Sequence, residues 1–448
     1  MQRPLYVPRW LTYLLPIGAA VFVVMATFSQ HSHRLPWSQL GTALIMAVIV
    51  GVVCLAPFVL VPSMRRVAAF PATVLVLMTT LWMAFPHKLI PTAIVLLAIM
   101  VTVKGKSTFQ LIKGLSVLCV SAILVATVGA VWSSQIAADG HLPEQTMVLQ
   151  RTPDIYFIVP DRFCNHIGLL ESGYDNSEFL EYLESEGFYV DWGEVSEDEL
   201  LPESKAPATT RTIRFLASVL NLGVDVPMNV LYNRASRMVK HHAVGEILQA
   251  NGYTYHHIGD WWAETETNPM ADIVYVHRAT SLMPSDELSM ALIDRSIYRY
   301  LTSCLWRGYD AYRNRNIYQL ESFQEAVAST SPKFVFVHTL VPHPPYVWAA
   351  DGSPQRDHTL SAEEGYIEQV KWTETFLKQL IAEVDNDAIL IIQSDEGITY
   401  TARGENNGLT NHQWNGVLAA WRIPGADPSE LEDVRITEIL AYVLYSLA

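Results

Sequence analysis

Carboxylate and imidazole side chains follow three apolar runs of the sequence, and this arrangement suits metal chemistry. They are Asp161 after the first run, His338 and His343 in and after the second, and Asp395 and Glu396 after the third. Because ligands gather beyond the carboxyl ends of strands in open α/β sheets, we expect these side chains to converge. Oxygen and nitrogen ligands of this kind bind divalent cations. One aspartate at a strand end is more often a capping residue, so the expectation depends on the pattern recurring.

A hydroxyl-rich loop at residues 207–212 offers candidate nucleophiles. Thr209, Thr210 and Thr212 lie in it, and a helical pattern follows from about Ile213. A hydroxyl at a helix N-terminus lies near free backbone N–H groups and the positive end of the helix dipole, which favour an anion. An ordinary threonine N-cap fits the same residues. The loop therefore predicts either an anion-binding nucleophile or a helix cap.

The apolar runs themselves are predicted to be buried strands, because they are short and rich in β-branched and aromatic residues. They cover residues 154–160, 333–340 and 388–393, with further strands expected at 188–190 and 253–258. Helical spacing lies between them, at residues 176–186, 213–222, 241–250 and 362–383. This alternation predicts an α/β domain with a mostly parallel sheet sandwiched by helices.

The first 133 residues have the composition of a membrane segment. They contain no Asp or Glu and nine Lys or Arg, whereas the remainder holds 21 basic and 45 acidic residues, a net charge of −24. Five apolar stretches lie there, at residues 10–27, 40–61, 67–85, 89–103 and 111–132. A helix needs about 20 apolar residues to cross a hydrocarbon core of ~30 Å. We therefore expect a bundle of about five transmembrane helices in residues 1–133.

The basic residues between these stretches predict the orientation. With the N-terminus in the cytoplasm, the inner loops hold seven of the nine, and the outer loops hold only Arg34 and Lys88, as the positive-inside rule requires. Five crossings of the cytoplasmic membrane then place a linker at 134–151 and one catalytic domain at 152–448 on the periplasmic or extracellular side. The absence of acidic residues in the stretches argues against a transporter.

Four blocks of the outer part resemble the sulfatase-like branch of the alkaline phosphatase superfamily. Residues 153–163 (PDIYFIVPDRF) resemble its opening strand, and residues 211–221 (RTIRFLASVLN) its nucleophile segment. Residues 334–346 (FVFVHTLVPHPPY) resemble the block whose histidine contacts the substrate phosphate, and residues 391–397 (IIQSDEG) the "SDHG" block of metal ligands. With its membrane part, the chain resembles lipoteichoic acid synthases and phosphoethanolamine transferases.

The resemblance implies roles for individual residues. Asp161 and Asp395 match metal ligands. Thr212 matches the nucleophile, which also ligates the metal, when the LASVLN segment is aligned without a gap; Thr209 and Thr210 are the alternatives. His343 matches the phosphate-contacting histidine.

Other positions are less directly matched. Arg211 or Arg214 would neutralise phosphoryl oxygens. Glu396 stands where many relatives have histidine, and as a ligand it would make the site less zinc-like. His338 and His412 have no firm counterpart and are either second-site ligands or structural residues; His412 is kept as a candidate ligand.

The resemblance implies a metal-dependent phosphotransferase or phosphodiesterase that acts on lipid or envelope-glycan phosphoesters through Thr212. The metal is Mn, Mg, Ca or Zn, and no nucleic-acid partner is expected. The outer part lacks the Cys/Ser-X-Pro-X-Arg pattern of sulfatases that mature a formylglycine, which favours phosphoryl over sulfate chemistry. A catalytically altered protein with a binding or scaffolding role and a sulfate-ester hydrolase are the alternatives. Whether Cys164 and Cys304 pair is left open by the sequence.

Overall fold

A computed structural model describes most of the chain in two compact units. The described residues are 13–32, 35, 37–61, 69–80, 120–131, 147–193, 208–227, 230, 232–277, 286–294, 296, 310–357, 359–400 and 408–448. The first unit comprises residues 1–139 and 281–308, and the second comprises residues 140–280 and 309–448. The chain therefore passes from the first unit to the second, returns once, and then re-enters the second.

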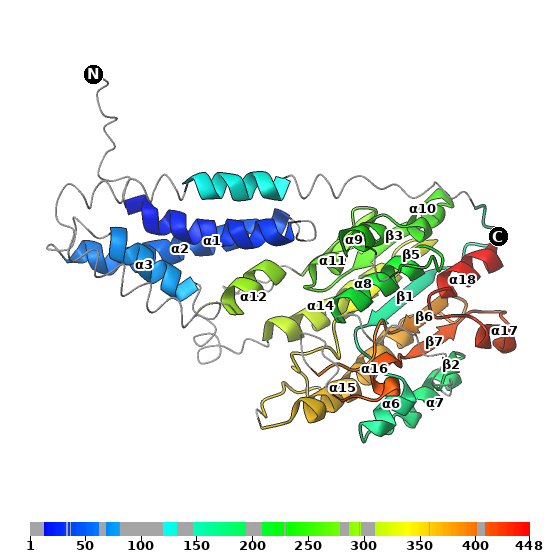
Figure 1. Ribbon diagram of the computed structural model, residues 1–448. Helices are drawn as coiled ribbons and strands as arrows, with labels where there is room; N and C mark the ends of the chain where they lie inside the picture. The colour runs from blue at the N-terminus through cyan, green and yellow to red at the C-terminus, as the bar shows by residue number, and fades with distance from the viewer. Residues whose placement is uncertain are drawn as a thin grey trace. The chain divides into compact units, whose positions relative to one another are not determined.

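The first unit is helical. Its described helices are α1 (Leu15–His31), α2 (Trp37–Leu60), α3 (Ala69–Thr80), a helix at Val120–Val131 and α12 (Glu287–Asp294). The first three pack against one another (Figure 1). Gly51 lets α2 approach α1 closely, because a Cβ there would lie 2.6 Å from the Ile17 Cα. Small residues of this kind allow close packing of apolar helices.

Only one of the described helices, at Gln39–Leu60, has the length and hydropathy that a membrane crossing requires. The helices at Leu15–His31 and Val120–Val131 are apolar but shorter. The expected stretch at 89–103 and parts of the third and fifth lie outside the described residues. The bundle of five transmembrane helices thus stays a prediction.

The second unit contains a seven-stranded sheet in the order β2-β7-β6-β1-β5-β3-β4. Its strands are β1 (Ile155–Pro160), β2 (Tyr189–Asp191), β3 (Thr254–Ile258), β4 (Ile273–Tyr275), β5 (Lys333–Thr339), β6 (Ile389–Gln393) and β7 (Ala419–Arg422). The five strands from β6 to β4 are parallel, and β7 pairs antiparallel with both β6 and β2. The predicted mostly parallel α/β sheet is confirmed.

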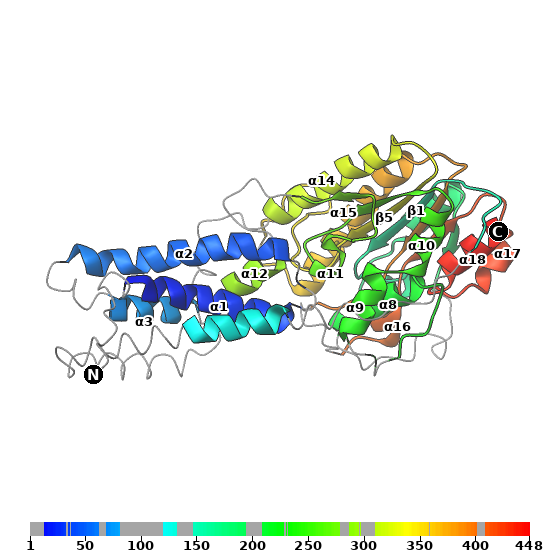
Figure 2. The same cartoon turned by 90° about the horizontal axis from the view of Figure 1, so that it is seen from above.

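Side chains of the central strands alternate between two hydrophobic cores. Tyr156 and Ile158 of β1 face one core, whereas Ile155, Phe157 and Val159 face the other. The first core is closed by α6 (His166–Glu171), α7 (Ser177–Ser185), α14 (Asp310–Val327) and α15 (Ala362–Ala382). The second is closed by α8 (Ala208–Val219), α9 (Tyr232–Lys240), α10 (Ala243–Ala250) and α18 (Ile439–Leu447). Figure 2 shows α14 and α15 on one side of the sheet and α8, α9 and α10 on the other.

Three short helices complete the second unit: α11 (Ala263–Glu266), α16 (Asn411–Asn415) and α17 (Pro428–Glu432). One predicted boundary is wrong. Helix α8 begins at Ala208 rather than near Ile213, so Thr212 lies inside the helix and not at its N-terminus. The free backbone N–H groups of α8 belong to its first turn, so Thr212, one turn further along, does not lie beside them as expected.

Candidate active site

Asp161, His338 and Asp395 converge beyond the carboxyl ends of three adjacent strands. Asp161 directly follows β1, His338 is the second-last residue of β5, and Asp395 follows β6 by two residues. One ligand atom from each lies within 4.8 Å of the other two, and all three residues are buried. Of the five side chains that were expected to converge, Asp161, His338 and Asp395 therefore form one group.

The ligand atoms of this group fit a divalent cation. Among the described residues, no hydrogen bond reaches Asp161 Oδ1, Asp395 Oδ2 or His338 Nε2, although each atom is buried. Buried polar atoms normally have a partner, and an unmatched one calls for an explanation such as an ion. Two carboxylate oxygens and one imidazole nitrogen are a donor set that Zn²⁺ or Mn²⁺ accepts.

The electrostatics of the group also favour a cation. Burial, reinforced by the carboxylate of Asp395, raises the pKa of Asp161 well above its usual value. Burial likewise raises the pKa of Asp395, even though a hydrogen bond from the Thr212 hydroxyl acts in the opposite direction. Burial lowers the pKa of His338 to about 3, so its imidazole is neutral. Carboxylates that are costly to ionise together are compensated by a positive charge placed between them.

Glu396 is held by an ion pair rather than placed with this group. Arg162 Nε donates to Glu396 Oε1 at 2.7 Å, and Arg162 Nη1 donates to the Thr399 carbonyl at 3.1 Å. Burial alone would lower the pKa of Arg162, but the carboxylates of Glu396 and Asp161 outweigh it and raise the pKa. Glu396 therefore has a counter-ion within the protein through Oε1, whereas its buried Oε2 has no hydrogen-bond partner among the described residues.

Helix α8 places the hydroxyl of Thr212 and the guanidinium of Arg211 near Asp395. The Thr212 hydroxyl lies near the Asp395 carboxylate and lowers its pKa, and Thr212 is buried. Arg211 Nη2 donates to the Trp414 carbonyl at 2.7 Å, and its guanidinium lies 4.8 Å from the Trp414 ring centroid. Arg211 Nη1 has no hydrogen-bond partner among the described residues. Arg214 lies half-buried further along α8.

His343 lies in the loop after β5. Its Nδ1–H donates to the Pro344 carbonyl, and its ring lies edge-on to Trp261 at 6.4 Å. Burial and the charge of Arg162 lower the pKa of His343 well below its usual value. The neutral ring keeps Nε2 as an acceptor. The cavity beside it has a volume of about 10 Å³, which is room for about one water molecule.

His412, expected as a metal ligand, is not part of the group of Asp161, His338 and Asp395. It lies in α16, where its backbone carbonyl accepts from the thiol of Cys164 at 3.4 Å. Burial raises the pKa of Cys164, so the thiol is protonated. Cys304 lies outside the described residues, and its pairing remains open.

Sequence reasoning missed an acid at a fourth strand end. Asp260 follows β3, and its Oδ1 pairs with Arg315 Nη1 at 3.4 Å while Oδ2 accepts from the Leu340 N–H at 3.0 Å. Its charge contributes to the raised pKa of Asp161. The signal was available, because Ile258-Gly259-Asp260 ends a strand in the same way as the three chosen runs.

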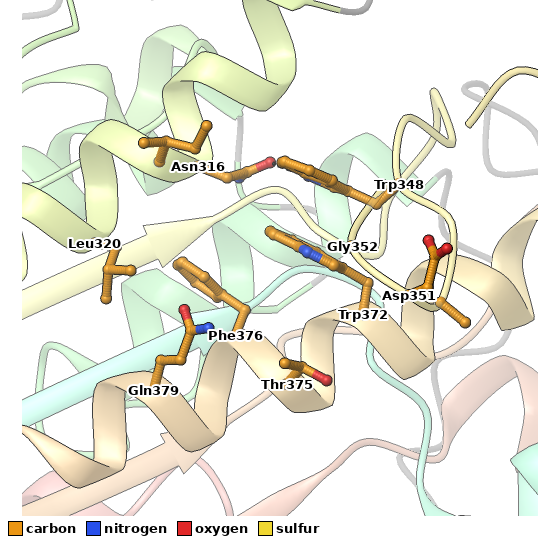
Figure 3. A pocket seen from close by; sticks show the side chains of 11 residues that line it. Asn316, Leu320, Trp348, Asp351, Gly352, Trp372, Thr375, Phe376 and Gln379 are labelled. Carbon is orange, nitrogen blue, oxygen red and sulfur yellow. Dashed lines mark hydrogen bonds between the residues drawn. The ribbon is translucent and has the colours of Figure 1, made fainter. Parts of the chain in front are cut away.

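A larger cavity of about 530 Å³ lies between α14, α15 and the loop after β5. Figure 3 shows Trp348 and Trp372 side by side in its wall, with ring centroids 4.2 Å apart. Phe376 also stacks on Trp372, with ring centroids 5.3 Å apart. Asn316 borders both this cavity and the small one beside His343, but the larger cavity holds no candidate nucleophile or metal ligand from the predicted set.

Three solved structures are similar to this chain at low sequence identity. The C-terminal periplasmic domain of EcEptC from Escherichia coli, in complex with Zn, shares 16% identity at a TM-score of 0.40, covering 68% of this chain and 86% of that one. The soluble domain of lipooligosaccharide phosphoethanolamine transferase A from Neisseria meningitidis shares 11% identity at a TM-score of 0.37, covering 68% and 88%. A protein in the alkaline phosphatase superfamily from Vibrio parahaemolyticus shares 14% identity at a TM-score of 0.35, covering 62% of each chain.

No curated protein sequence matches this chain at a significant level. The profile of the sulfatase family, in contrast, matches residues 161–425. That segment runs from the aspartate after β1 to the turn after β7, and it spans more than half of the chain. The chain therefore belongs to the sulfatase family.

Proposed function

We propose that this protein is a membrane-anchored, metal-dependent phosphotransferase or phosphodiesterase with Thr212 as its nucleophile. The observation that carries the proposal is the buried group Asp161, His338 and Asp395, three candidate ligands with unmatched atoms, beside which the Thr212 hydroxyl lies close enough to lower the pKa of Asp395. A hydroxyl beside three candidate metal ligands is the arrangement that an activated oxygen nucleophile needs.

Asp161, His338 and Asp395 would hold the cation. A divalent cation bound there would lower the pKa of the Thr212 hydroxyl and neutralise charge on the phosphoryl oxygens. Glu396, His412 and the threonine itself stay proposed ligands of lower rank, because Glu396 is paired with Arg162 and His412 lies outside the group.

The chain's own residues account for the proton and charge movements. Thr212 Oγ1 attacks the phosphorus and its proton passes to Asp395, while the leaving alkoxide, on the opposite side of the phosphorus, takes a proton from solvent. The bond to the leaving alcohol breaks as the bond to Thr212 forms. Arg211 Nη1, which has no hydrogen-bond partner among the described residues, would donate to the phosphoryl oxygens.

The second step needs a proton acceptor, and His343 would fill this role as a neutral ring whose lowered pKa makes it a weak base. Because its Nδ1–H donates to the Pro344 carbonyl, Nε2 is left to accept a proton from water or from an acceptor hydroxyl. That oxygen attacks the phosphorus as the bond to Thr212 breaks; Thr212 takes its proton back from Asp395, and His343 releases its proton to solvent. Water gives hydrolysis, whereas the hydroxyl of a lipid or glycan gives transfer.

The substrate class follows from the membrane part. A catalytic domain tethered at a bilayer meets lipid-linked substrates at a high effective concentration. Lipid or envelope-glycan phosphoesters are therefore the proposed substrates, with the catalytic domain on the periplasmic or extracellular side. About five transmembrane helices exceed what anchoring alone needs, which favours transfer over hydrolysis.

One observation favours a second candidate, a catalytically altered protein with a binding role. The Arg162–Glu396 ion pair places a permanent cation next to the acidic group, with 3.8 Å between Arg162 Nε and Asp161 Oδ1. If this guanidinium replaced the metal, Thr212 would not be activated. Bound metal together with turnover distinguishes the two candidates.

The test is turnover of a p-nitrophenyl phosphodiester by the full chain in detergent. Thr212→Ala should lose several orders of magnitude in rate, as the loss of a covalent nucleophile does. Thr209→Ala and Thr210→Ala should lose far less. Trapping the phosphorylated protein and mapping the label provides the second measurement. Label on Thr209 or Thr210 would refute the assignment, and full activity of Thr212→Ala would refute covalent catalysis by this residue.

A further inference from the structure

We propose that Thr265 is a positioning residue that fixes the His338 ring with Nε2 toward Asp161 and Asp395, and that a buried chain of His242, Tyr255 and His257 holds Thr265 in place. This inference rests on the proposed metal site and names the residues that orient its nitrogen ligand. Metal-bound histidines usually donate their second ring N–H to a protein group, which fixes the orientation of the ring.

The contact between His338 and Thr265 is short and fully enclosed. His338 Nδ1 lies 2.7 Å from Thr265 Oγ1, and neither side chain is exposed to solvent. With Nδ1 engaged by the hydroxyl, only Nε2 is left for the carboxylates, and Nε2 is the atom that has no hydrogen-bond partner among the described residues. A cation on Nε2 requires that Nδ1 carry the proton and that Thr265 Oγ1 accept it.

The hydrogen bonds that lead from the Thr265 carbonyl through His257, Tyr255 and His242 determine which ring nitrogen carries each proton. The Thr265 carbonyl can only accept, so His257 Nε2, at 2.7 Å, carries a proton. At 3.2 Å, His257 Nδ1 then accepts from the Tyr255 hydroxyl. The Tyr255 oxygen in turn accepts from His242 Nε2 at 3.4 Å, and His242 Nδ1 accepts from the Gly245 N–H at 3.0 Å.

This assignment is consistent from both ends of the chain. It begins at a carbonyl that cannot donate and ends at a backbone N–H that cannot accept, and each ring in between carries one proton. Burial lowers the pKa values of both His242 and His257 to about 3, so each ring is neutral, as the assignment requires. A buried polar chain in which every member is satisfied rigidifies its surroundings.

The backbone around Thr265 is anchored as well. Lys240 Nζ donates to the carbonyls of Ala263 and Thr267, on either side of Thr265, and Ser236 donates to the Glu264 carboxylate. A Cβ on Gly259 would lie 1.8 Å from the Thr265 carbonyl oxygen, so only glycine lets β3 end this close to α11. Thr265 is therefore fixed through both its carbonyl and its neighbours.

The test measures binding of Zn²⁺ to the full chain in detergent, by competition with a chromophoric chelator. Thr265→Val should weaken binding by about 10–100-fold, the usual effect of removing a group that orients a metal ligand. Thr265→Ser keeps the hydroxyl and should bind like the wild type. Thr373→Val is the matched control, because Thr373 is equally buried and its hydroxyl donates to the Gln369 carbonyl of α15.

A double-mutant comparison separates positioning from general loss of structure. If Thr265 acts through His338, Thr265→Val should cause no further loss in a His338→Ala background. An equal loss in both backgrounds, or wild-type binding by Thr265→Val, would overturn the inference. Asp395→Ala tests the proposed function separately: unchanged Zn²⁺ binding there would refute the metal site itself, whereas loss there with full binding by Thr265→Val would refute only the role of Thr265.

Discussion

Arg162 is the residue that most changes the chemistry expected of the strand-end cluster. It has a positive φ of 65°, which is uncommon for a residue other than glycine and concentrates at functional sites. The backbone turn lets its side chain reach Glu396 while its own N–H donates to Asp395 Oδ1 at 3.2 Å. One residue thus neutralises one carboxylate and orients another.

Removing one partner of this buried pair should be costly. Arg162→Met should lower the stability of the full chain by about 3–5 kcal/mol, because Glu396 would be left buried without its counter-ion. The double variant Arg162→Met with Glu396→Met should recover much of that loss. Chemical denaturation followed by tryptophan fluorescence, with a chelator present, measures both.

The exposed pair Arg435–Glu438 provides the control. Arg435→Met should change stability little, because solvent screens an exposed ion pair. If the double variant at 162 and 396 proved as unstable as Arg162→Met alone, the loss could not come from an unpaired Glu396.

At this scale the sequence predicts the acids better than it predicts their partners. Asp161 and Asp395 were expected together because strand ends of a parallel sheet share an edge. His338 was expected with them as well, and the structure agrees: it lies on the same face of β5 as Phe334 and Phe336, which face the α8 core. The Arg162–Glu396 pair could not be predicted, because no sequence pattern signals the positive φ on which it depends.

Among the elements, strands are more predictable than helix starts. The runs that became β1, β5 and β6 are short, apolar and bounded, so their limits agree with the structure to within one residue. Helix α8 begins at Ala208, whereas the apolar pattern that predicted it begins at Ile213. The first turn of the helix contains no large apolar residue, so hydrophobic periodicity could not locate it. Strands β4 and β7 were not predicted; β4 has only three residues, and β7 pairs antiparallel.

The contact of α15 with the segment after α6 predicts a pH dependence. Tyr174 donates to Glu374 Oε2 at 2.7 Å. Burial raises the pKa of Glu374 from 4.5 to about 8. The folded protein thus holds this proton more tightly than the unfolded chain, so the stabilisation is complete below pH 4.5 and is lost as the pH rises through 8.

Glu374→Gln mimics the protonated acid and should remove this dependence. At pH 8 the variant should be more stable than the wild type by on the order of 4 kcal/mol, since one pKa unit is worth about 1.4 kcal/mol, whereas at pH 5 the difference should be about 1 kcal/mol. Thermal midpoints at both pH values test this. Glu184→Gln serves as a control, because Glu184 is exposed and accepts one hydrogen bond from Trp192. An equal difference at pH 5 and pH 8 would contradict the assignment.

For the whole molecule, the charge bias predicts a topology that reporter fusions can test. A phosphatase reporter, active only outside the cytoplasm, should work when fused after Ser133 and fail when fused after Ser63, next to Arg65 and Arg66. The reason is that basic loops stay in the cytoplasm. Activity of a cytoplasmic reporter after Ser133 would refute both the orientation and the proposed compartment of the catalytic domain.

The return of the chain to the first unit has a consequence for release of the catalytic part. Helix α12 belongs to residues 281–308, packs on α1 and α2, and donates its Leu288 N–H to Gln39 Oε1 at 3.1 Å. A protease that cuts once between residues 132 and 146 would therefore leave the downstream fragment held by α12. Release of the second unit would require further cuts on both sides of α12, or it would pull α12 out and expose Leu288, which is fully buried in the structure. A single cut in this segment would therefore not separate the second unit from the first.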